Sequence, residues 1–109
     1  MAATREEVAS IFPEIVKRFD PSKAAGLNAT IQFDLSGDNG GSYWLRFAND
    51  QAETGEGKAE DAKMTLKSSA DDFASMMAGK LNPMQAFMTG KIKIQGDTGL
   101  AMKLMPLMS

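Results

Sequence analysis

The sequence contains no cysteine and no histidine among its 109 residues. These absences exclude a disulfide framework, a thiolate nucleophile, a Cys/His zinc site and an imidazole base. Carboxylates, lysines, one tyrosine and hydroxyls are the groups left for acid–base or nucleophilic chemistry. We therefore expect no catalytic residues, no metal site and no cofactor, and these absences disfavour an enzyme.

Excess positive charge and long apolar runs are also missing. The formal net charge is −2, which argues against a nucleic-acid partner because such proteins carry basic patches. No segment approaches the roughly 18 uninterrupted apolar residues of a membrane-spanning helix. The start, MAATREEVAS, does not resemble a signal peptide, and the end, LMS, does not resemble a peroxisomal address. We expect a cytoplasmic protein.

The bulk composition matches an ordinary globular protein. Hydrophobic residues make up 43% of the chain and charged residues 24%. A chain of this length supports one hydrophobic core without covalent cross-links. We expect a single domain over residues 1–109.

A helix is predicted near the N-terminus. Thr4 and Glu7 have the spacing of a capping box. From Val8 to Phe19, apolar residues recur at helical spacing and define one buried face. Pro13 lies inside this pattern and is expected to kink or split the helix.

Alternating apolar and polar residues predict strands in the remainder of the chain. Residues 27–35 and 42–48 alternate on either side of a Gly-rich turn and form a predicted antiparallel hairpin. The hydrophilic segment 51–60 predicts a weak strand at a sheet edge. Residues 62–67 and 91–95 predict two more strands, which gives five in all.

The hairpin is expected to have one face exposed to water. In the first strand Thr30, Gln32 and Asp34 occupy the outward positions. In the second strand Trp44 and Arg46 share the outward face, where the guanidinium can stack over the indole. We assign this aromatic residue no binding role.

The C-terminal part, residues 69–109, contains seven of the nine methionines. Ser69 and Asn82 have the positions of helix caps, which predicts two short amphipathic helices. The adjacent Asp71 and Asp72 suit a first helical turn and are not a catalytic pair, because neighbouring side chains on a helix diverge by about 100°. Residues 100–108 are apolar almost all round, so this helix is expected to be buried on several sides or to face a ligand, a partner or a membrane surface.

These segments resemble the sterol carrier protein type 2 domain, which is also called the non-specific lipid-transfer protein domain. The resemblance rests on Asp72-Phe73, Gly79–Pro83, Ala86-Phe87 and Gly90–Asp97, and it extends to Arg18–Pro21 near the N-terminus. The glycines and prolines are the specific part of the pattern, because they fix chain reversals between elements. The similarity covers essentially the whole chain.

The resemblance implies an α+β fold in which helices pack on one face of a five-stranded, mostly antiparallel sheet. It also implies an apolar tunnel between sheet and helices that takes a fatty acid, fatty acyl-CoA, phospholipid or sterol-like ligand. The chain would then be an intracellular lipid-binding and lipid-transport protein. By matching position, the tunnel would be lined by Phe33, Met64, Leu66, Phe73, Met76, Met77, Leu81, Met84, Phe87, Met88, Ile92, Leu100, Leu104 and Met105.

The terminal helix departs from the family pattern. Met105 and Met108 stand where the family has glutamines, which makes the implied tunnel more apolar. Lysines, among them Lys80 and Lys91, could attract a ligand carboxylate or phosphate at the mouth. Transient membrane contact and a monomer or weak dimer are compatible with this interpretation. The alternative is an accessory domain whose apolar C-terminal helix docks on a partner or on a second copy.

Overall fold

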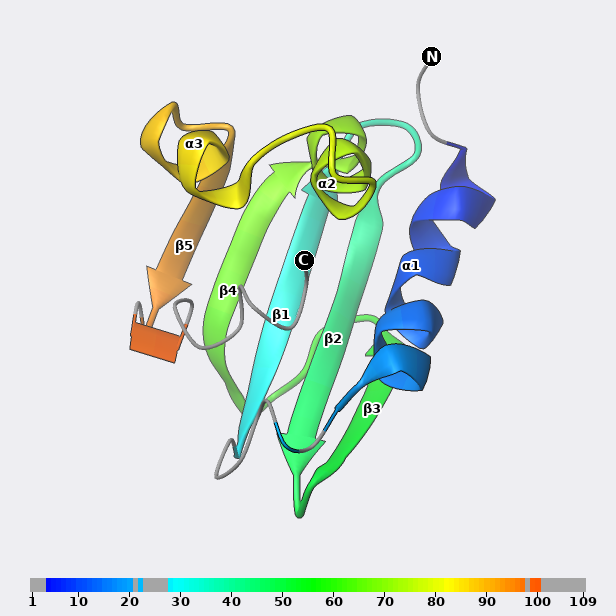
Figure 1. The fold of residues 1–109 in the computed structure, drawn as a ribbon, viewed down its shortest axis with the longest axis vertical. Coiled ribbons are helices and arrows are strands. Elements are labelled where there is room, and N and C mark those ends of the chain that lie inside the picture. Colours follow the sequence, from blue (N-terminus) through cyan, green and yellow to red (C-terminus); the bar gives the residue numbers. More distant parts are fainter. Residues whose placement is uncertain (1–3, 21, 23–27, 98, 101–109) are drawn as a thin grey trace.

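A five-stranded sheet forms the centre of the computed structural model, with helices on one side (Figure 1). The structure describes residues 4–20, 22, 28–97 and 99–100. The predicted final helix and the segments 23–27 and 101–109 lie largely outside these residues. The elements, in chain order, are α1 (Arg5–Arg18), β1 (Ala29–Ser36), β2 (Gly41–Ala48), β3 (Gln51–Glu56), β4 (Ala62–Ser69), α2 (Ala70–Met77), α3 (Pro83–Met88) and β5 (Ile92–Gly96).

The strand order is β3-β2-β1-β4-β5. The pairs β1–β2, β2–β3 and β4–β5 are antiparallel, whereas β1 and β4 are parallel. Asn49 and Asp50 join β2 to β3 with φ angles of 54° and 60°, as a two-residue hairpin turn requires. The predicted α+β class and mostly antiparallel sheet are confirmed.

The predicted capping box begins α1. The backbone N–H of Glu7 donates to Thr4 Oγ1 at 3.1 Å. The helix then continues through Pro13 to Arg18, so the predicted split does not occur. Phe12 and Ile15, on either side of the proline, are both buried against the sheet, and this packing holds the segment in one helix.

Side-chain caps also fix the two short helices. The backbone N–H of Asp72 donates to Ser69 Oγ at 3.1 Å at the start of α2. At the start of α3, Asn82 Oδ1 accepts from the backbone N–H groups of Met84 and Gln85 at 2.9 and 3.2 Å. Both caps were predicted from the sequence, because each satisfies donors that a first helical turn leaves unpaired.

A cluster of aromatic rings fills the core beneath α1 and α2. The ring of Phe12 lies 4.5 Å from that of Tyr43, 5.2 Å from Phe33 and 5.5 Å from Phe73, between centroids. Phe33 and Phe73 are themselves 5.6 Å apart. Rings from two helices and two strands thus pack together, which ties both helices to the same face of the sheet.

The other face of β1 is not exposed to water as the alternation predicted. Thr30 and Gln32 are only 3% and 4% exposed. The connection between β3 and β4, residues 57–61, covers this face: Gln32 Nε2 donates to the Gly57 carbonyl at 3.0 Å, and the Ala59 N–H donates to Gln32 Oε1 at 2.7 Å. The expectation was wrong because local alternation contains no information about the path of a distant connection.

Candidate functional site

The side chains that were predicted to line a tunnel fall into distinct groups in the structure. Seven are buried in the core: Phe33, Met64, Leu66, Phe73, Met76, Ile92 and Leu100. Two more, Met77 and Leu81, are partly buried and pack against that core. Leu104 and Met105 lie outside the described residues. The tunnel itself is not outlined by the residues that the structure describes, so it stays a prediction.

The buried group limits where a ligand can lie. Phe33 and Phe73 have no exposed surface, so in this conformation neither ring borders an open cavity. On the same side of the sheet, Ile94 of β5 is only partly buried. Its partner on β4, Leu66, and Ile92 on the same face of β5 are almost fully buried. The apolar side is therefore packed tightly over β1 and less completely over β5.

The remaining three predicted lining residues project from α3 into solvent. Met84 is 53%, Phe87 42% and Met88 81% exposed. Ala86, also on α3, is fully buried. The structure therefore does not bring these three side chains together with the buried group.

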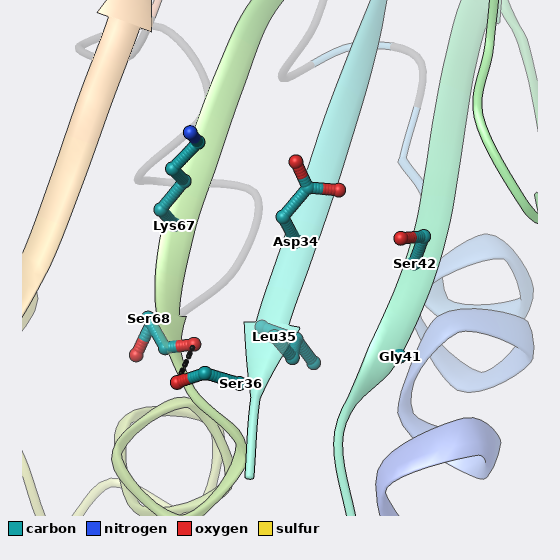
Figure 2. Close-up of a pocket in the computed structure, with 7 residues that line it drawn as sticks. All are labelled: Asp34, Leu35, Ser36, Gly41, Ser42, Lys67 and Ser68. Carbon is teal, nitrogen blue, oxygen red and sulfur yellow. Dashed lines mark hydrogen bonds between the residues drawn. The ribbon is translucent and has the colours of Figure 1, made fainter.

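A second candidate region was not predicted from the sequence. It is a pocket of about 330 Å³ near the C-terminal ends of β1 and β4, and Figure 2 shows the residues that line it. Asp34, Ser42 and Lys67 come from three adjacent strands and occupy paired positions in the sheet. The lining is completed by Leu35, Ser36, Gly41 and Ser68.

Hydroxyl groups and opposite charges dominate this pocket. Ser36 Oγ donates to the Ser68 carbonyl at 3.4 Å. Such a lining suits a small polar group better than an acyl chain. The outward alternation of Asp34 and Lys67 was visible in the sequence, but the parallel pairing that makes them neighbours was not.

A polar network lies further along the same face. Arg46 Nη2 donates to Asp61 Oδ1 at 3.2 Å, and Thr30 Oγ1 donates to Asp61 Oδ2 at 3.2 Å. Desolvation raises the pKa of Asp61, but these hydrogen bonds and the charge of Arg46 outweigh it and hold that pKa below its ordinary value. Arg46 also stacks over the Trp44 ring, 5.0 Å from its centroid, as predicted. The network ties the β3–β4 connection to β1 and β2.

In the described ranges, no three acidic side chains are grouped in a way that could hold a metal ion. Within the same ranges, no helix has the length and apolar character needed to cross a bilayer.

Longer proteins contain a segment similar to this chain. Hydroxysteroid dehydrogenase-like protein 2 of Mus musculus is 43% identical over 82 residues, which is 74% of this chain and 17% of that protein. The protein of the same name from Danio rerio is 34% identical over 103 residues, 94% of this chain and 25% of that protein. The chain thus spans between about a sixth and a quarter of the length of these two curated relatives.

Solved structures share the fold over almost the whole chain. The sterol carrier protein domain 2 of Helicoverpa armigera has a TM-score of 0.79 at 27% identity and covers 99% of this chain and 91% of its own. The sterol carrier protein 2 of Aedes aegypti, solved as a complex with palmitate, has a TM-score of 0.68 at 18% identity, with coverages of 100% and 97%. The sequence also matches the profile of the SCP-2 sterol transfer family over residues 12–109. By this match and by its fold, the chain is a member of the SCP-2 sterol transfer family.

Proposed function

We propose that this domain binds a fatty acid, fatty acyl-CoA, phospholipid or sterol-like lipid in an apolar tunnel and carries it through water. The role requires binding and release and no bond making. Family membership supports the general activity, and a protein of the same fold has been solved as a complex with palmitate.

The observation that carries the proposal is the uneven packing of the apolar side of the sheet. Over β1, the rings of Phe12, Phe33 and Phe73 pack against one another and are almost fully buried. Towards β5, Ile94 remains partly exposed, and Met77 and Leu81 are partly buried. An acyl chain would enter on this side, because fewer close contacts have to be broken there.

Flexible side chains make such entry feasible. Met64 and Met76 are buried beside the partly buried Met77, and unbranched thioethers adopt new rotamers at low free-energy cost. Each methylene that a ligand buries contributes about 0.8 kcal/mol, partly offset by the ordering of ligand and side chains. Since dispersion contacts discriminate poorly between chain shapes, we expect loose specificity among lipids of similar length.

A matched pair of variants tests this location. Ile94 on β5 and Ile11 on α1 are both partly buried isoleucines that pack against the core. We expect Ile94→Glu to weaken displacement of a fluorescent fatty acid by palmitate at least tenfold, because a carboxylate in the acyl path must be desolvated. Ile11→Glu should leave that affinity within about twofold if both variants are folded by circular dichroism.

Native mass spectrometry of the freshly purified domain complements this assay, because a co-purified lipid would identify the natural ligand class directly. Equal affinity in the two variants would place the ligand elsewhere. Failure of the unaltered domain to bind any fatty acid, acyl-CoA, phospholipid or sterol would refute the carrier role.

A further inference from the structure

The outward face of α3 has a composition that is unusual for a helix surface. Met84, Phe87 and Met88 are the large hydrophobic side chains that the described part of the chain exposes. Phe87 and Met88 follow Met84 by three and four residues, so both lie next to Met84 on one side of the helix. An apolar cluster of this kind on a protein surface marks an interaction site.

The orientation of α3 is fixed by its backbone and by its inward residue. Ala86 is fully buried, and its small side chain lets the helix approach β5, with which α3 packs. The N–H of Lys91 donates to the Ala86 carbonyl at 2.8 Å, and the Asn82 cap holds the other end. The apolar face is therefore presented to solvent by a well-anchored helix and not by a loose loop.

The charge around this face differs in sign from that of the whole protein. Between Phe73 and Gly96 the sequence has three lysines and no aspartate or glutamate, although the chain carries 14 acidic residues and a net charge of −2. Lys80 precedes α3, Lys91 follows it, and Lys93 lies on the strand that α3 packs against; all three are exposed. Cationic side chains thus flank the apolar cluster.

We propose that α3 with Lys80, Lys91 and Lys93, here called the α3 face, docks the domain on an anionic membrane surface. This inference rests on the carrier role proposed above, since a lipid carrier must meet a bilayer to load and unload. The apolar side chains would enter the boundary between headgroups and acyl chains, and the lysines would pair with anionic headgroups. A lipid surface is favoured over a folded partner because Met84 and Met88 project as flexible apolar chains, which a fluid interface accommodates without shape complementarity.

Intrinsic fluorescence gives a direct test. The native Trp44 alternates along β2 with Tyr43 and Leu45, which are buried in the core, so it lies on the opposite face of the strand under Arg46. Its emission should therefore not change when vesicles are added. In the Phe87→Trp variant we expect a blue shift with vesicles of phosphatidylserine and phosphatidylcholine in equal parts, and a much weaker one with phosphatidylcholine alone. A shift of the native signal with none from the added indole would overturn the proposal.

Charge variants with a matched control test the lysines. We expect the triple variant Lys80→Gln, Lys91→Gln, Lys93→Gln to bind the anionic vesicles about a hundredfold more weakly, at roughly fivefold for each lysine. The control triple variant Lys17→Gln, Lys58→Gln, Lys63→Gln removes the same charge from exposed positions on α1, the β3–β4 connection and β4. Equal losses in the two variants would mean that bulk charge is responsible and would overturn the local docking face.

An apolar variant completes the test. The double variant Met84→Gln, Met88→Gln changes only exposed side chains and should keep the fold while reducing vesicle binding at least about tenfold. Unchanged vesicle binding by this variant would refute the proposal. A wild-type dimer that becomes a monomer in this variant would also refute it, because the α3 face would then be the interface between two copies of the chain. Palmitate displacement by the unaltered domain, measured without vesicles, reports the carrier role by itself, so failure of docking and failure of the carrier role are distinguishable.

Discussion

Gln32 provides the sharpest test of how this sheet is held together. Its side chain lies in the middle of β1 and is 4% exposed. Its amide joins two backbone groups of the β3–β4 connection, donating to the Gly57 carbonyl at 3.0 Å and accepting from the Ala59 N–H at 2.7 Å. Gln32→Ala removes both bonds and leaves the connection without this anchor.

The expected loss can be worked out from these contacts. Each neutral hydrogen bond contributes about 0.5–1.5 kcal/mol net, and a third, longer bond of 3.4 Å to Asp34 Oδ1 adds little. We expect Gln32→Ala to lower the free energy of unfolding by about 1–3 kcal/mol. For a domain of this size that corresponds to a fall of roughly 5–20 °C in the melting temperature.

Urea denaturation followed by far-ultraviolet circular dichroism measures this loss, with Gln95→Ala as the control. Gln95 is an exposed residue of β5, so its truncation should change stability by less than about 0.5 kcal/mol. If the two variants are equally stable, the connection is not held by Gln32, and the explanation given for the burial of Thr30 and Gln32 is wrong.

Two further predictions concern the same face. A Cβ at Gly55 would overlap the Trp44 ring, so Gly55→Ala should destabilise the fold by about 1–3 kcal/mol and shift the fluorescence emission of Trp44. The control Glu53→Ala, on the same strand, should do neither. An unshifted emission spectrum in Gly55→Ala would contradict the contact between Gly55 and Trp44. The pKa of Asp61 is lowered in the folded state, so its ionised form stabilises the protein above the ordinary pKa of 3.8, and this contribution is lost as the pH falls through the lower, folded-state value. The difference in melting temperature between the wild type and Asp61→Asn should therefore be present at neutral pH and shrink on acidification below about pH 3.8, and a difference that grows would refute the assignment.

Local rules were sufficient for much of the fold. Helix caps at Thr4, Ser69 and Asn82 were readable because a cap needs only a few neighbouring residues. The hairpin of β1 and β2 was readable from alternation and turn residues. The continuity of α1 through Pro13 was not, because it depends on burial of the residues on either side against the sheet.

The candidate site was harder to predict for the same physical reason. The spacing of Met84, Phe87 and Met88 correctly indicated a shared helix side, but nothing in the spacing says whether that side faces the core. The inward position belongs to Ala86, whose small size allows close packing on β5. Likewise, Asp34 and Lys67 become neighbours only through the parallel pairing of β1 and β4, which no local pattern encodes.

That parallel pair also determines how the chain can reach its fold. The strands β1, β2 and β3 are joined by short turns, so they can pair through contacts between residues close in sequence. The strands β4 and β5 join this sheet only when β4 pairs with β1. The first paired residues, Thr30 and Ala62, are more than thirty positions apart in the sequence. Closing so large a loop is entropically costly and slow compared with forming a hairpin. We therefore expect β4 and β5 to join a sheet in which β1, β2 and β3 are already paired.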